Sequence, residues 1–138
     1  MAGVTATMGM GLLMGAQTGA LADVAPTAPT ATVTPSTGLT DGATVQIAAS
    51  GFGANETLTA GQCATVDGKA ACNVNNRTEL TTDGSGGASA AMVVNRSFEA
   101  VFADDGTFAG TVDCGTAACY IGVGNFSGQG DQVPIGFR

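Results

Sequence analysis

The sequence contains no histidine, no tryptophan and a single tyrosine among its 138 residues. Without histidine the chain cannot build the Ser-His-Asp or Cys-His sets of nucleophilic catalysis, and it lacks the usual general base near neutral pH. Cations are also scarce, since four Lys and Arg stand against eleven Asp and Glu, for a formal net charge of −7. Phosphate binding needs clustered cations, so the protein surface is not expected to bind nucleic acid. We predict that the protein is not an enzyme.

Helical periodicity is missing as well. Outside the first 22 residues, the many glycines, the β-branched residues and the turns interrupt every window with a 3.6-residue period. Turn signals such as Asp41-Gly42, Asp83–Gly87 and Asp104–Gly106 recur at the spacing of an antiparallel sandwich. We predict a single all-β domain over residues 32–138, a two-sheet sandwich of about seven strands. Pro134 marks the last strand as an edge strand or a bulged one.

The first 22 residues carry no charge and include the apolar run Met8–Ala16, followed by the small-residue pattern Ala20–Ala22. We interpret residues 1–22 as a secretory signal peptide, too short in its apolar run to span a membrane. The basic region expected at its start is missing, which leaves room for a start farther upstream. A disordered apolar tail is the alternative. Residues 23–31, rich in Pro, Ala and Thr, are predicted to be an extended lead-in.

Cys63 and Cys72 lie at matched positions in a predicted β-hairpin. Asp67-Gly68 favours a two-residue type I′ turn, because both residues tolerate a positive φ. With this turn Cys63 faces Cys72 as a non-hydrogen-bonded pair, with Cα atoms about 4.5 Å apart, within reach of a disulfide. Pairing them leaves Cys114 with Cys119, whose short glycine-containing segment can close a second loop.

A zinc site built from the four cysteines is the alternative to disulfides. The Cys-x-x-Cys spacing of zinc knuckles is missing, and an exported protein oxidises its thiols. We therefore expect disulfides and no metal.

The same hairpin offers a candidate binding face. Its register places Cys63, Thr65, Ala70 and Cys72 on one side, and such small or sulfur-bearing side chains leave room for a ligand. The alternative is that this face packs into the core. Three aromatic residues near loop ends are candidates either for the walls of a cleft or for the core: Phe102, Tyr120 and Phe126.

Several short motifs keep their order and nearly their spacing with those of a known family. They are Ala28–Pro35, Gly38–Gly42, Gly61–Ala64, Ala71–Asn73, Arg96–Glu99, and Gly110–Cys114 with Ala117–Cys119. From about residue 28 to the C-terminus the sequence resembles the neocarzinostatin family. The resemblance implies an immunoglobulin-like sandwich of seven antiparallel strands with two local disulfides. It also implies a cleft for a non-covalent enediyne chromophore, with no catalytic cofactor.

The resemblance further implies which residues hold the ligand. Cys63 and Cys72 would form the floor of the cleft, and Gly61 and Gln62 would lie beside it. The walls would include Val101, Phe102, Tyr120 and Gly124. Thr65 and Arg77 stand where the protein that gives the family its name carries aromatic rings against its chromophore. Losing those rings is expected to remove about 1–3 kcal/mol of stacking and burial.

The function implied is that of a secreted, monomeric carrier of a hydrophobic enediyne, antibacterial or cytotoxic because the released cargo damages DNA. DNA would be contacted by the released cargo and not by the protein. Two alternatives remain at this point. One is a secreted immunoglobulin-like binding module, or a paralogue without a chromophore. The other is a protease acting on basic proteins, against which the missing histidine argues.

Overall fold

The computed structural model describes residues 28–138, so the predicted signal segment and residues 23–27 of the lead-in lie outside the described residues. All regular secondary structure in the described part is β. The strands are β3 (Thr30–Thr34), β4 (Thr44–Ser50), β5 (Thr57–Val66), β6 (Lys69–Thr81), β7 (Ala88–Val93), β8 (Ser97–Phe102), β9 (Phe108–Asp113), β10 (Cys119–Gly124) and β11 (Gly130–Ile135). Within residues 28–138 no helix has the length and apolar character needed to cross a membrane.

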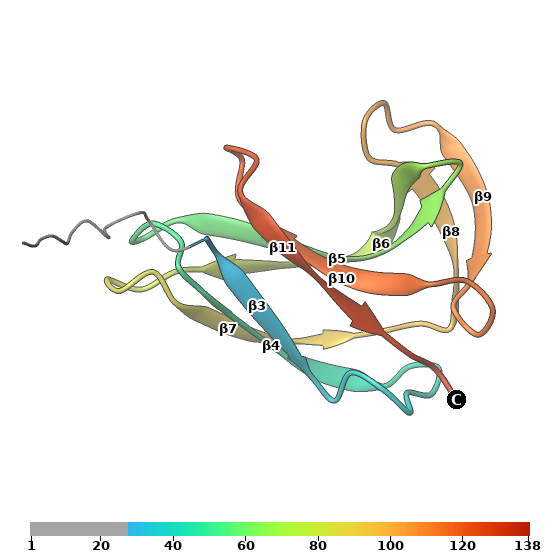
Figure 1. The fold of residues 1–138 in the computed structure, drawn as a ribbon, viewed down its shortest axis with the longest axis horizontal. Helices are drawn as coiled ribbons and strands as arrows, with labels where there is room; N and C mark the ends of the chain where they lie inside the picture. Colours follow the sequence, from blue (N-terminus) through green and yellow to red (C-terminus); the bar gives the residue numbers. More distant parts are fainter. Residues whose placement is uncertain (1–27) are drawn as a thin grey trace, which may run out of the picture.

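The strands form two antiparallel sheets (Figure 1), as predicted. One has six strands in the order β11-β10-β5-β6-β8-β9, and the other has three in the order β3-β4-β7. The described residues form nine strands where about seven were predicted, and among these β8 and β9 form a hairpin that pairs with the larger sheet through β6. The strand carrying Pro134 is an edge strand, as predicted, and β3 includes Thr30 and Ala31 from the predicted lead-in.

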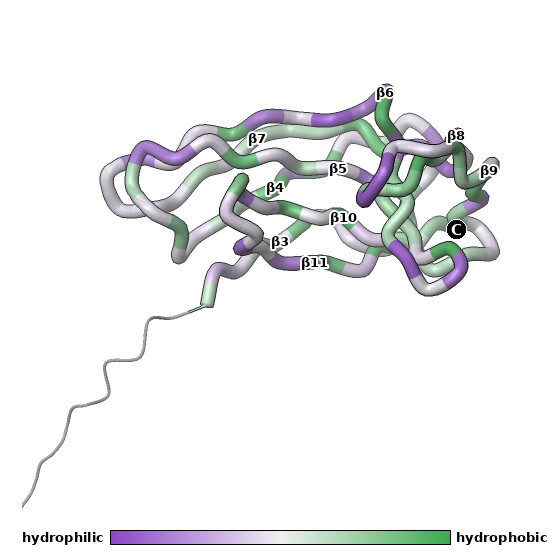
Figure 2. The backbone as a smooth tube through the Cα atoms, turned by 90° about the horizontal axis from the view of Figure 1, so that it is seen from above, coloured by the Kyte–Doolittle hydropathy of each residue, from purple (hydrophilic) through white to green (hydrophobic). Residues whose placement is uncertain are grey.

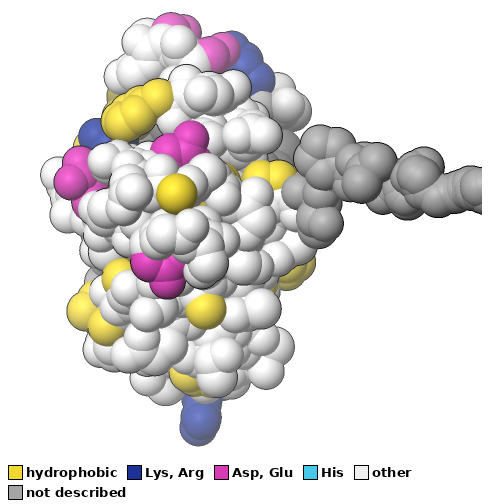
Figure 3. Space-filling model, turned by 90° about the vertical axis from the view of Figure 1, so that its left-hand side faces the viewer, with side chains coloured by type: hydrophobic (Ala, Val, Ile, Leu, Met, Phe, Trp, Pro, Cys, Tyr) yellow, Lys and Arg dark blue, Asp and Glu magenta, His cyan; other side chains and the backbone are white. Residues whose placement is uncertain are grey.

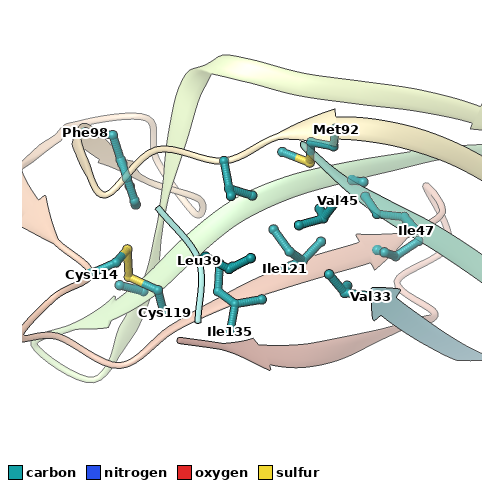
Figure 4. Close-up of a cluster of buried hydrophobic side chains, with 14 of the residues drawn as sticks. Val33, Leu39, Val45, Ile47, Met92, Phe98, Cys114, Cys119, Ile121 and Ile135 are labelled. Atoms are coloured by element: carbon teal, nitrogen blue, oxygen red, sulfur yellow. A yellow bond between two sulfur atoms is a disulfide. The ribbon is translucent and has the colours of Figure 1, made fainter. Parts of the chain in front are cut away.

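The core between the sheets is aliphatic and comes from period-two alternation along the strands. On β4, Val45 and Ile47 are fully buried while their neighbours are exposed, and on β10 Ile121 is fully buried between partly buried neighbours. Figure 4 shows these side chains directed toward one another, with Val33 and Met92 beside them. Figure 2 shows mixed hydropathy along most strands, as expected where only one face is buried.

The stapled hairpin has the predicted register. Cys63 pairs with Cys72 and Val66 with Lys69, around a turn in which Asp67 and Gly68 have φ of 52° and 77°. The Cys63–Cys72 disulfide joins Cα atoms 4.0 Å apart. The second disulfide, Cys114–Cys119, joins Cα atoms 5.6 Å apart. All four cysteines are thus consumed in disulfides, which leaves no thiolate for zinc.

The pairing of β5 with β6 is interrupted above the staple. Gly61 pairs with Arg77, whereas Cys63 pairs with Cys72, so Gln62 alone stands opposite the four residues 73–76. The extra residues bend β6. On the side of the bend nearer the hairpin turn, Ala71, Cys72 and Asn73 pair with β8. Figure 1 shows the hairpin end, β8 and β9 rising together from one end of the sandwich. This bend separates the staple from the flat part of the sheet and positions the site.

Candidate functional site

A cleft of about 370 Å³ lies where β5, β6, β8 and β10 meet, on the face of the larger sheet opposite the core. Six of the ten sequence-predicted ligand residues line it: Gly61, Cys63, Cys72, Arg77, Val101 and Phe102. The side-chain alternation of β10 explains the location, because Ile121 and Val123 point into the core and Gly122 faces the cleft.

The floor of the cleft consists of two cross-strand rows. In the first row the Cys63–Cys72 disulfide lies next to Val101 on β8, and Tyr120 on β10 pairs with Cys63 just outside the lining of the cleft. In the second row Gly122 lies opposite Gly61, which in turn lies opposite Arg77. The first row supplies a rigid sulfur surface, and the second is low because two of its members lack side chains.

Gly61 and Gly122 leave space in the cleft, although the backbone conformation does not require glycine at either position. Neither Gly61 nor Gly122 has a positive φ. A Cβ atom added at Gly122 would lie 3.7 Å from Tyr120 Cε1, and one added at Gly61 would lie 3.8 Å from Arg77 Cγ, both ordinary contacts. A Cβ atom at either position would therefore fit the fold while taking up space in the cleft.

Phe102 forms one wall of the cleft, and Lys69 packs against its ring. The Lys69 ammonium lies 4.9 Å from the centre of the Phe102 ring and 3.6 Å from the Asp104 carboxylate. Both groups of the Lys69–Asp104 ion pair are about half exposed, so this pair contributes little to stability.

Gln62 lies outside the cleft, contrary to the expectation that it sits beside the floor. Its side chain is fully buried on the other side of β5 and is bonded to the backbone of Asn95. The reason is the alternation of the strand, in which Gly61 and Cys63 face the cleft and the residue between them faces away.

Three other predicted residues lie around the cleft without lining it. Thr65 is exposed beyond the staple, toward the hairpin turn. Tyr120 is half-buried beside Cys63, and this burial raises the pKa of its phenol. Gly124 lines an adjoining hollow of about 670 Å³ along the β10–β11 hairpin, which shares Gly122 with the cleft. Phe126, a candidate wall residue, is 87% exposed at the tip of that hairpin.

Some lining residues were not anticipated from the sequence: Thr59, Val74, Ala103, Gly106 and Gly122. Alternation from Gly61 would have found Thr59, and alternation from Tyr120 would have found Gly122. Val74 lies in the bent part of β6, and nothing in the sequence signals that bend.

The carboxylates of the described residues are dispersed. No group of three or more Cys, Asp and Glu within residues 28–138 is arranged to hold a metal ion. Hydrogen bonds from Ser85 and from Gly87 lower the pKa of Asp83, and those from Thr107 lower the pKa of Asp105, both in loops outside the cleft lining. Figure 3 shows acidic side chains scattered over one face with few cations.

Comparison with known proteins gives consistent matches. Residues 31–137 match the model of the Neocarzinostatin family. The chain is 45% identical to the antitumor antibiotic C-1027 apoprotein of Streptomyces globisporus, over 89% of this chain and 82% of that protein. It is also 45% identical to actinoxanthin of the same organism, with the same coverage. The solved structure of macromomycin is 41% identical and superposes with a TM-score of 0.76, covering 80% of this chain and all of that one.

Proposed function

Because this chain belongs to the neocarzinostatin family, we propose that it is an apoprotein that binds, shields and carries a hydrophobic enediyne chromophore in the cleft above Cys63–Cys72. A relative at 45% identity is itself named as the apoprotein of an antibiotic, which supports a cargo-carrying role. The cargo is non-covalent and hydrophobic, and its release delivers the antibacterial or cytotoxic activity.

The observation that carries this proposal is the open cleft over the disulfide. Its floor combines sulfur, small side chains and two glycines, and its walls include Val101 and Phe102. A binding module without cargo would be expected to fill this space with its own side chains, since unfilled apolar surface is costly. The glycines at 61 and 122 leave it unfilled although a Cβ atom would fit at both positions.

The remaining features fit a secreted carrier and not an enzyme. Disulfides form and persist in oxidising compartments outside the cytosol. The net charge of −7 makes the protein surface a poor partner for DNA, so DNA is reached by the released chromophore. The missing histidine argues against a protease acting on basic proteins.

The experiment compares the unmodified protein with Gly122→Val, and with Gly84→Val as the matched control. Gly84 lies in an exposed loop with no atom within 4 Å of an added Cβ. Purified proteins are titrated with a panel of enediyne chromophores while Tyr120 fluorescence and the melting temperature are followed. We expect quenching and a raised melting temperature for the unmodified protein and for Gly84→Val. Gly122→Val should lose both responses while keeping its ligand-free melting temperature.

Two outcomes would contradict the proposal. If no chromophore changes the fluorescence or the melting temperature of the unmodified protein, the carrier function is wrong and the cargo-free binding module is favoured. If Gly122→Val binds as tightly as the unmodified protein, the ligand does not occupy the cleft described above.

A further inference from the structure

We propose that Arg77 makes the cleft selective for an aromatic ligand that carries a carboxylate or similar oxyanion. The inference rests on the proposed carrier function and specifies the chemistry of the cargo. The hydrophobic part of such a ligand would lie over the disulfide, and its anionic group would meet the guanidinium.

Arg77 is the one charged residue among those that line the cleft. It lies on β6 directly opposite Gly61, in the floor row next to the Cys63–Cys72 row. Its Cγ atom would be 3.8 Å from a Cβ added at Gly61, so its aliphatic stem passes over the glycine. The guanidinium is thereby brought to a site whose other walls are apolar or uncharged.

The guanidinium has no partner among residues 28–138, unlike the three other cations of the chain. Lys69 pairs with Asp104, and Arg96 lies 3.4 Å from Asp113. Arg138 donates from Nε to the carbonyl oxygen of Gly38 at 3.2 Å. In a chain with eleven Asp and Glu residues, the cation at the cleft has neither an ion pair nor a side-chain hydrogen bond within the described residues. Its five N–H donors are therefore available to a ligand.

The charged residues around the cleft indicate where the anionic group of the ligand would lie. Lys69 and Asp104 neutralise each other beside Phe102, at the staple end. Glu79 lies two residues beyond Arg77 on β6, opposite Thr59, and is not within ion-pair distance of Arg77. An anion bound at the guanidinium would thus be held between the apolar staple and the carboxylate of Glu79, which disfavours any farther position along β6.

Guanidinium and carboxylate groups match each other in a planar, two-point hydrogen-bonded arrangement, and the guanidinium face also stacks on aromatic rings. A hydrogen bond to a charged group in a partly exposed site corresponds to a preference of about tenfold in affinity. A neutral ligand of the same shape would lack this gain.

The test uses two fluorescent probes with one ring system, 2-anthracenecarboxylate and the neutral 2-anthracenecarboxamide. Affinities are measured for the unmodified protein, Arg77→Met, Arg77→Lys and the control Arg138→Met, which removes a cation that does not line the cleft. We expect the unmodified protein and Arg138→Met to prefer the carboxylate about tenfold. Arg77→Met should lose the preference, Arg77→Lys should keep part of it, and the affinity for the amide should be equal in all four.

The outcomes separate this inference from the proposed function. Equal affinity of the unmodified protein for both probes, or a preference that survives Arg77→Met, overturns the role of Arg77 and leaves the carrier function standing. Failure of both probes to bind the unmodified protein overturns the role of Arg77 too. Together with a negative titration against the enediyne panel, that failure contradicts the carrier function as well.

Discussion

The side-chain amide of Gln62 bonds to both backbone polar groups of Asn95. Its Oε1 accepts a hydrogen bond from Asn95 N at 2.9 Å, and its Nε2 donates to Asn95 O at 2.6 Å. The same Nε2 lies 3.4 Å from Cys114 Sγ. One buried side chain thus joins the interrupted part of β5 to the β7–β8 connection and to the second disulfide.

Replacing Gln62 by leucine should lower the free energy of unfolding by about 2–3 kcal/mol, because two partly buried backbone groups of Asn95 lose their partner. Urea denaturation followed by circular dichroism measures this loss. The matched control is Gln46→Leu on the exposed face of β4, which should change stability by less than about 0.5 kcal/mol. Ligand affinity should not change, and an affinity loss without a stability loss would place Gln62 in the cleft after all.

The two disulfides should differ in their effect on binding. Replacing Cys63 and Cys72 by alanine should cost about 3 kcal/mol of stability, and replacing Cys114 and Cys119 about 2 kcal/mol, since the second loop is shorter. Only the first pair lines the cleft, so only its loss should weaken ligand binding. Denaturation curves and ligand titrations on both double variants test this. An equal loss of affinity in the two variants would show that the staple acts only through global stability.

Tyr120 provides an intrinsic pH probe, because it is the single tyrosine of the chain. Burial raises the pKa of its phenol above the ordinary 10.0. Between pH 10 and the native pKa, the folded protein keeps a proton that the unfolded chain releases, so stability falls as the pH rises through this window. Phenolate absorbance should titrate at higher pH in native protein than in guanidinium chloride. A ligand over Cys63 should raise the native midpoint further, and an unchanged midpoint would exclude Tyr120 from the site.

Asp131 links the two sheets at their edges. Its Oδ2 accepts a hydrogen bond from the backbone N–H of Ala31 at 2.9 Å, which ties β3 to β11. Asp131→Ala should lower stability by about 1–2 kcal/mol and speed hydrogen exchange at the Ala31 amide. The neighbouring exposed Gln132→Ala is the control and should leave that amide protected. Unaltered exchange in Asp131→Ala would show that other contacts hold β3 in place.

The sequence predicted well what depends on neighbours along the chain. The Asp67-Gly68 turn sets the register of the hairpin, and the register in turn sets the Cys63–Cys72 pairing. Each of these steps depends on a few residues close together in the sequence and on the geometry of a single type of turn. The wider fold followed from turn spacing and from the family resemblance, and both agree with the two antiparallel sheets.

The site was predicted less completely because its shape depends on the bend in β6. Four residues on β6 stand opposite Gln62 alone, and neither the hydropathy pattern nor the glycine positions predict this irregular pairing. Val74 lies in this bent segment and lines the cleft. Gln62 was a different kind of error, since strict alternation from Cys63 would have turned it away from the ligand. The unpaired state of Arg77 requires knowing where every acidic side chain lies, which only the structure gives.

Because of its bend, β6 contributes residues both to the sandwich core and to the cleft. Leu80, near its C-terminal end, belongs to the sandwich core, whereas Val74 lies exposed at the cleft. Within the bent segment Asn73 is buried and pairs with Ala100, and Asn76 is bonded to Val93 and Asn95, whereas the side chains of Val74 and Asn75 are exposed. Val74 and Asn75 are therefore the positions in this segment at which a protein engineer could substitute side chains to adapt the carrier to a new cargo while keeping these contacts.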